Sequence, residues 1–219
     1  MADNTSRMIA LLGAMRKQMN GAVADAMRYY GNKYGLNYGV SLPTLRSIAM
    51  TEQRDHSLAQ YLYKQQVREL RLAALHIAEP EKMTLSEATF WAEGVINSEV
   101  AEEMSFALLS RAAEAKQIIE EWSKSDNEFL VYAALMAAAR CADNISKELI
   151  LSATEIIGKY PSSRIIAQGI VTLLVAAYAS DKETATSIIS EIKEAAKPQQ
   201  EAFSAAQYIT EELEWRIEA

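Results

Sequence analysis

The chain has 219 residues, half of them apolar, so it is long enough to bury a substantial core without disulfides or metal ions. One cysteine excludes an internal disulfide, and two histidines leave no Cys/His cluster with the spacing of a zinc site. We therefore expect no metal, no cofactor and a reduced, cytoplasmic setting. A net charge of −7 argues against a nucleic-acid partner if that charge is spread evenly, because DNA is a polyanion.

The charge is not spread evenly along the chain. Residues 1–78 carry ten Lys and Arg against five Asp and Glu, whereas residues 79–219 carry twelve against twenty-four. A basic N-terminal part on an acidic body can present one positive face to a partner. Solvated helix faces without any partner explain the same counts, and both interpretations stay open at this stage.

The first predicted element lies near the N-terminus. Met8, Leu11, Leu12, Met15 and Met19 recur at helical spacing, which indicates an amphipathic helix and not a secretion signal. No apolar run reaches the ~18 residues that a membrane span needs. We therefore expect no membrane-spanning segment.

An irregular loop from Tyr34 to Pro43 follows. Gly35 and Gly39 interrupt helix, and Ser41 followed by Pro43 is typical of a helix start, because the amides of a first turn are unpaired in any case. A helix is expected to begin directly after this loop.

The later segments carry helix signals and almost no strand signals. Residues 129–139 (FLVYAALMAAA) are apolar on all sides, which is typical of a helix buried within a stack. Three Ser/Thr-x-x-Glu patterns predict capping boxes at helix starts. They pair Thr84 with Glu87, Ser125 with Glu128, and Ser180 with Glu183.

The four prolines suggest an internal repeat. Pro43 and Pro80 are 37 residues apart, and so are Pro161 and Pro198. A unit of about 40 residues built from two helices is the size of a HEAT-type repeat. We therefore predict an all-α fold, an armadillo-like α-solenoid or superhelix of antiparallel HEAT-like helix pairs, as a single domain over residues 1–219.

Three segments form an ordered set of motifs: YGVSLPTLRSIA at residues 38–49, VRELRLAAL at 67–75 and WSKSDN at 122–127. The set resembles the AlkD-type DNA alkylation repair glycosylases. Those proteins share a Gly-Val-x-x-Pro-x-x-Arg helix start, an arginine-and-glutamate helix start and a Trp-x-x-Ser-Asp-Asn turn. The resemblance covers roughly residues 25–180 and implies a HEAT-like α-solenoid that holds duplex DNA against a concave, basic face.

The resemblance also implies where that family's chemistry would lie. Its tryptophan and aspartate, spaced four apart, fall on Val100 and Met104; a tryptophan and an arginine fall on Phe129 and Tyr132, and a later aromatic on Leu173. The aspartate stabilises positive charge on the sugar as a cationic base leaves, and aromatic faces hold the nucleotide. Met104 has no charge and Val100 has no aromatic face. We therefore expect no catalytic residue here and do not favour an enzyme.

Three functions remain in competition. The first is a non-catalytic relative of these glycosylases that binds DNA, including distorted or branched DNA, through phosphate contacts from basic residues. The candidate contacts are Arg46, Lys64, Arg68 and Arg71. Lys64, Arg68 and Arg71 follow one another at steps of four and three residues, which predicts that they share one side of a helix.

The second function is an active alkylpurine glycosylase with a rearranged site, in which Glu102 or Glu103 replaces the missing aspartate. The third is a protein-interaction scaffold, because solenoids offer extended concave surfaces and most of this chain is acidic. The partner is thus DNA or another protein. Basic residues on the binding face favour DNA, and an acidic or apolar face favours protein.

Overall fold

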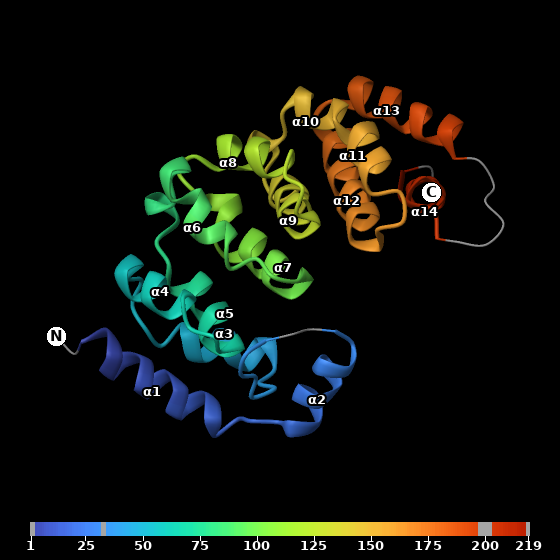
Figure 1. Cartoon of the computed structure of the whole chain (residues 1–219). Coiled ribbons are helices and arrows are strands. Elements are labelled where there is room, and N and C mark those ends of the chain that lie inside the picture. Colours follow the sequence, from blue (N-terminus) through green and yellow to red (C-terminus); the bar gives the residue numbers. More distant parts are fainter. Residues whose placement is uncertain (1–2, 32–33, 197–202, 218–219) are drawn as a thin grey trace. The chain divides into compact units, whose positions relative to one another are not determined.

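The computed structural model describes residues 3–31, 34–196 and 203–217. Within these residues every regular element is a helix, fourteen of them α-helices and four of them short 3-10 helices (Figure 1). An isolated bridge joins Leu36 to Val67. No helix in the described part is long and apolar enough to cross a membrane. The all-helical expectation is confirmed.

The chain divides into two compact units, and the expectation of a single domain stays a prediction. The first unit comprises residues 1–83 and 87–113, and the second comprises residues 84–86 and 114–219. The α-helices of the first unit are α1 (Asn4–Arg16), α2 (Gly21–Tyr29), α3 (Leu42–Ala49), α4 (His56–Tyr63), α5 (Arg68–Ile77), α6 (Ala88–Ala92) and α7 (Ser98–Ala107). Its 3-10 helices are η1 (Pro80–Lys82) and η3 (Leu109–Arg111), while η2 (Leu85–Glu87) lies at the boundary.

The second unit contains the remaining helices. They are α8 (Ala115–Trp122), α9 (Glu128–Ala138), η4 (Ala142–Asn144), α10 (Lys147–Leu151), α11 (Ala153–Lys159), α12 (Arg164–Ser180), α13 (Lys182–Ala195) and α14 (Ala205–Ile217).

In the first unit α5 is the central helix. It packs against α3, α4 and α7, and every residue of α5 except His76 is buried. Its apolar run therefore forms the core, together with Leu45 of α3 and Leu58 and Leu62 of α4. The first predicted helix is confirmed as α1, which buries Leu11 and Met15.

In the second unit α9 and α12 form the core. The two helices pack against each other, and most of α9 is buried, as its apolar sequence predicts. Gly169 of α12 allows close packing, since a Cβ atom there would lie 3.0 Å from Leu135 and 3.2 Å from Tyr132.

The predicted start of α3 is confirmed. Ser41 is the N-cap, and its side chain accepts a hydrogen bond from the backbone N–H of Thr44 at 3.3 Å. Pro43 occupies the first turn, where its missing N–H costs nothing. The preceding loop needs Gly39, which has φ of 69° and whose Cβ would lie 2.1 Å from the carbonyl of Asn20.

The three predicted capping boxes do not form. Helix α9 is capped by Asn127, which accepts from the N–H of Phe129 at 3.0 Å, and α13 by Asp181, which accepts from Thr184 at 3.1 Å. Thr84 instead pairs with the hydroxyl of Ser86 ahead of a 3-10 turn. Asn and Asp cap as well as or better than Ser and Thr. Asn127 and Asp181, which lie closer to the first helical residue than Ser125 and Ser180 do, therefore become the N-caps.

The prolines do not mark a common position of a repeat. Pro43 lies in the first turn of α3, Pro80 opens η1, and Pro161 precedes α12. Pro198 lies outside the described residues. Proline tolerates any position whose N–H is unpaired, so equal spacing in sequence does not require equivalent positions in the fold.

Candidate nucleic-acid interface

Two of the motifs in the sequence meet at the start of α5. Arg68 is fully buried, and its guanidinium donates to the Glu99 carboxylate at 2.6 and 2.8 Å, to Glu69 at 3.0 Å and to the carbonyl of Val40 at 2.9 Å. The Glu69 carboxylate in turn accepts from the backbone N–H groups of Tyr38 and Val40. These residues therefore fix the loop before α3 onto α5.

The charges of this network stabilise one another. Burial lowers the pKa of Arg68, but the hydrogen bond and charge of Glu99 raise it more, so the net shift is upward. Burial and the Glu99 carboxylate raise the pKa of Tyr34, whose hydroxyl donates to Glu99 at 2.6 Å. With its donors committed inside the first unit, the Arg68 side chain cannot contact DNA phosphates.

Arg46 is also paired inside the first unit. It donates to both carboxylate oxygens of Glu103 in α7, and it lies 4.7 Å from the centroid of the Phe106 ring. Its side chain keeps 34% exposure. His76 reaches the same carboxylate at 2.7 Å. Arg46 is thus partly exposed, but its guanidinium is paired with a buried carboxylate of its own unit.

The Glu103 carboxylate is consequently a structural anion. Its side chain is 3% exposed. Burial raises its pKa, but the hydrogen bonds from His76 and Arg46 outweigh that effect and lower the pKa to about 2. A carboxylate held by Arg46 and His76 inside the unit is poorly placed to stabilise charge on a substrate.

Lys64 and Arg71 remain as cations without a carboxylate partner among the described residues. Lys64 is exposed, and its ammonium lies 5.3 Å from the Phe90 ring centroid. Arg71 is only 6% exposed, and its guanidinium carbon lies 5.9 Å from the Tyr63 ring centroid. Both side chains line one cavity of about 170 Å³, which we call the Arg71 cavity; its other lining residues are Tyr63, Gln66, Phe90, Glu93 and Gly94.

The expectation that Lys64, Arg68 and Arg71 share one side of a single helix is wrong. Helix α4 ends at Tyr63 and α5 begins at Arg68. The break arises because Leu36 takes the intervening backbone hydrogen bonds: its N–H donates to the carbonyl of Gln66 at 2.8 Å, and its carbonyl accepts from Arg68 at 2.8 Å.

The positions expected from the resemblance to match the family's catalytic pocket are apolar or aromatic and mostly buried. In the first unit, Val100 and Met104 of α7 have no solvent exposure. In the second unit, Tyr132 of α9 and Leu173 of α12 have none either. Phe129 is partly exposed.

Ion pairing neutralises part of the positive charge of the N-terminal segment. Within residues 1–78, four carboxylates pair with arginines: Asp25 with Arg28, Glu52 and Asp55 with Arg7, and Glu69 with Arg68. The described cations of this segment without a carboxylate within 4.0 Å are Arg16, Lys17, Arg54, Lys64 and Arg71. Arg16 and Lys17 cannot be singled out from the sequence, because nothing in their spacing separates them from paired residues.

The two units differ in net charge. The first has twelve Lys and Arg against twelve Asp and Glu, whereas the second has ten against seventeen. The excess of positive charge over residues 1–78 is therefore balanced within the first unit by acidic residues of segment 79–113. A positive surface on this unit is local to its unpaired cations.

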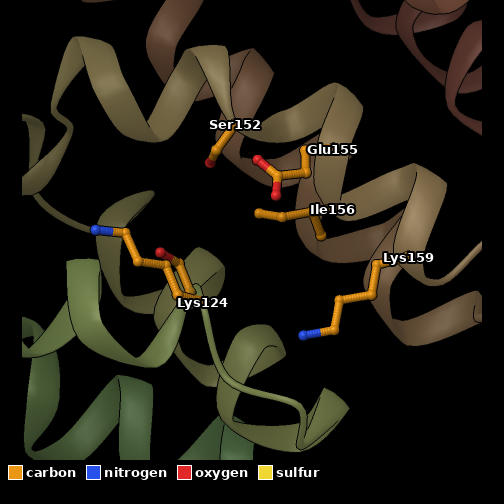
Figure 2. A pocket seen from close by; sticks show the side chains of 6 residues that line it. Lys124, Ser152, Glu155, Ile156 and Lys159 are labelled. Carbon is orange, nitrogen blue, oxygen red and sulfur yellow. The ribbon is translucent and has the colours of Figure 1, made fainter.

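A second cavity lies in the second unit, with a volume of about 90 Å³, between α8 and α10–α11. Its charged lining residues are Lys124, Glu155 and Lys159 (Figure 2). In Figure 2, Glu155 extends from α11 toward the side on which Lys124 lies. Lys159 is committed to Asp126 at 2.6 Å and to the carbonyl of Ser125 at 2.9 Å. This cavity therefore offers little unpaired positive charge for an anion.

Among the described residues, no group of three or more His, Cys, Asp or Glu side chains is arranged to hold a metal ion.

The comparison with protein families identifies the chain. The family model described as DNA alkylation repair enzyme matches residues 11–206. The chain belongs to this DNA alkylation repair enzyme family. The match confirms the resemblance seen in the three motifs. A search of curated proteins finds no match.

A solved structure shows the same fold as this DNA alkylation repair family member. It is described as "a new family of proteins related to the HEAT-like repeat DNA glycosylases with affinity for branched DNA structures". The likeness has a TM-score of 0.73 and 17% identity, and it covers 99% of this chain and 96% of that chain. At this identity it establishes the HEAT-like repeat helical fold, which confirms the predicted fold class.

Proposed function

We propose that this DNA alkylation repair family member binds DNA, with a preference for branched forms, and does not remove bases from it. The observation that carries the proposal is the contrast between two sets of residues. The positions of the family's catalytic aspartate and tryptophan hold Met104 and Val100, both fully buried and uncharged. Cations of the first unit, in contrast, remain without carboxylate partners among the described residues.

The phosphate contacts are assigned to cations of the first unit. Lys64 and Arg71 come together at one cavity, and Arg46 of α3 keeps a third of its side chain exposed. Arg16 and Lys17 at the end of α1 are exposed and unpaired among the described residues. Each phosphate contact by such a cation releases condensed counterions, which is the main source of non-specific DNA affinity.

The preference for branched DNA is taken from the structural neighbour. That neighbour is described as having affinity for branched DNA structures. The aromatic and acidic groups that would hold a cationic nucleotide are replaced at these positions, so the proposed surface binds DNA without base chemistry. A surface that reads phosphates alone can recognise the shape of a branch point instead of a damaged base.

The experiment that tests binding is fluorescence anisotropy with a four-way junction and a linear duplex of the same arm sequence. We expect tighter binding to the junction, and affinity that falls with salt. The slope of log affinity against log salt is expected at about −0.9 per phosphate contact. Replacing Lys64 and Arg71 together by alanine should flatten the slope by about two.

The matched control removes the same charge from the second unit. The double variant Lys116→Ala and Lys124→Ala should leave the slope unchanged, since both lysines lie in the acidic unit. No binding to either DNA at low salt contradicts the proposal and favours the protein-interaction scaffold. An equal effect of both double variants means that the contacts are not those assigned here.

A further inference from the structure

We propose that the Arg71 cavity binds a phosphate monoester, the group found at the end of a nucleic-acid strand. This inference rests on the proposed DNA binding for its nucleic-acid source and adds a specific group to it. The same chemistry occurs on a free nucleoside monophosphate, so the test below separates the two sources.

The first argument is the state of the Arg71 guanidinium. Arg71 is 6% exposed, and its Nε has no solvent contact and no hydrogen-bond partner among the described residues. Arg68, one turn earlier, is buried with two carboxylates and a carbonyl around it. Buried charges in proteins are normally paired. A guanidinium that lines a cavity and has no anion inside the unit is suited to take one from outside.

The second argument is the match of charge. A phosphate monoester carries a charge of about −1.5 to −2 at pH 7 and presents three strong acceptor oxygens. The cavity brings together the cations of Arg71 and Lys64, with Gln66 as a further polar lining residue. Arginine binds two phosphate oxygens at once with its planar fork. A phosphodiester within a strand carries only one negative charge and leaves the second cation unused.

The third argument is that the cavity is large enough and has firm walls. About 10–15 Å³ suffices for one water molecule, so about 170 Å³ accommodates a larger anion. The Tyr63 ring forms one wall and is fixed by its hydroxyl, which donates to the carbonyl of Trp91 at 2.8 Å. Gly94 lies against that ring, because a Cβ there would fall 2.2 Å from a ring carbon.

The Phe90 ring adds a surface for a base. Its side chain is partly exposed and packs against Tyr63 with ring centroids 5.9 Å apart. Bases stack on such aromatic faces without regard to sequence. A phosphate on Arg71 and Lys64 would thus place the attached nucleoside beside an aromatic face.

One lining residue opposes the proposed ligand. Glu93 is exposed and lines the cavity, but it forms no ion pair with Arg71 or Lys64. Its negative charge repels a phosphate dianion at close range. The proposal therefore predicts that Glu93→Gln, which removes this charge and keeps the shape, raises affinity for a terminal phosphate.

The test compares hairpin duplexes that differ only at their strand ends. One duplex carries a 5′-phosphate, one carries a 3′-phosphate, and one carries hydroxyls at both ends. The full chain is titrated into each at about 100 mM salt, where unspecific phosphate contacts are partly screened. We expect at least one phosphorylated end to bind about tenfold more tightly than the hydroxyl ends, a difference of about 1.4 kcal/mol. Arg71→Leu and Lys64→Leu should each abolish this ratio, and Glu93→Gln should increase it.

The control variant is Lys116→Leu, which removes one charge from an exposed position of α8 and should leave the ratio unchanged. Lys64 is exposed, so its variant keeps the test valid even if Arg71→Leu lowers the melting temperature. Deoxyadenosine monophosphate and deoxyadenosine are added as competitors. Competition by the monophosphate alone supports the site.

The outcomes separate this inference from the proposed function. Equal binding of all three duplexes with no competition by the monophosphate overturns the phosphate site and leaves DNA binding intact. Binding of the monophosphate without binding of any duplex assigns the site to a free nucleotide. That result overturns the claim that the phosphate belongs to a nucleic-acid strand. A ratio that survives both Arg71→Leu and Lys64→Leu overturns the assignment to this cavity.

Discussion

At the scale of single residues, the two arginines of α5 have opposite roles although they stand one turn apart. Arg68 holds Glu69 and Glu99 in the core, whereas Arg71 has no carboxylate among the described residues. Removing one partner of a buried ion pair leaves the other charge buried and uncompensated, which is strongly destabilising. Removing a buried charge that has no partner does not carry that penalty.

The first prediction contrasts these two residues. Arg68→Leu should lower the free energy of unfolding by about 3–5 kcal/mol, because Glu69 and Glu99 lose their counter-charge. Arg71→Leu should change it by less than about 1 kcal/mol, or raise it. Urea denaturation of the two variants beside the unmodified chain measures both values. Equal destabilisation by the two changes would show that Arg71 also carries a structural pair.

Sequence reasoning singled out candidate cations but not their partners. The resemblance pointed to Arg68, and a pattern of Lys64, Arg68 and Arg71 suggested one helical face. The carboxylate that neutralises Arg68 belongs to Glu99, which is 31 positions later on α7. No local pattern shows such a pairing, because it depends on which helices pack together.

The second prediction concerns Glu103 and acid stability. Its pKa falls from an ordinary 4.5 to about 2 in the folded chain, so the folded state binds this proton less readily than the unfolded state does. The resulting stability is present above about pH 4.5 and is lost as the pH falls toward 2. Its size is on the order of 3 kcal/mol.

Urea denaturation at pH 5 and at pH 3 tests this. The free energy of unfolding should fall more steeply with acidification in the unmodified chain than in Glu103→Gln. Glu102→Gln is the matched control, since Glu102 is exposed, and it should keep the steep dependence. Identical pH dependence in the chain and in Glu103→Gln would contradict the role assigned to this carboxylate.

At the scale of elements, the sequence predicted helices reliably and their first residues less so. The start of α3 was predicted correctly because Ser41 and Pro43 both favour the same boundary. The boundary before α13 was misplaced by one residue, since Ser180 is the last residue of α12 and Asp181 is the cap. Adjacent residues that can each cap a helix are separated by backbone geometry, which a pattern of residue types does not contain.

The third prediction uses this adjacent pair. Asp181→Ala should lower the free energy of unfolding by about 1 kcal/mol, because the Thr184 N–H loses its acceptor. Ser180→Ala should have a smaller effect, since its hydroxyl bonds only the carbonyl of Ala177 within α12. Thermal or urea denaturation at neutral pH compares the two. A larger loss for Ser180→Ala would mean that the predicted capping box forms after all.

At the scale of the whole molecule, charge and fold lead to different expectations about a partner. The family and the HEAT-like repeat fold were predictable because three motifs occur in order over most of the chain. The distribution of charge was not, because acidic residues of segment 79–113 belong to the same compact unit as the basic N-terminal segment. DNA binding by a chain with a net charge of −7 therefore has to be local and sensitive to salt.

Under the proposed function this chain keeps the family's fold without its chemistry, and the last prediction tests that. Val100 and Met104 in the first unit and Tyr132 and Leu173 in the second are all fully buried, so the positions expected to match the family's catalytic pocket lie in the core of each unit. We expect no release of 3- or 7-alkylated purines from methylated DNA above the spontaneous rate, measured by chromatography with an active family member as the positive control.

Restoring the acid alone should not restore activity. Met104→Asp places a carboxyl in an apolar, solvent-free position, where the charged form is disfavoured and the pKa rises. The variant should therefore unfold more easily at neutral pH than the unmodified chain, and it should release no alkylated purine. Release by the unmodified chain that disappears in Glu102→Gln or Glu103→Gln would instead support a rearranged active site. Glu103 already holds Arg46 and His76 inside the first unit. We therefore expect no base release by the unmodified chain or by either variant.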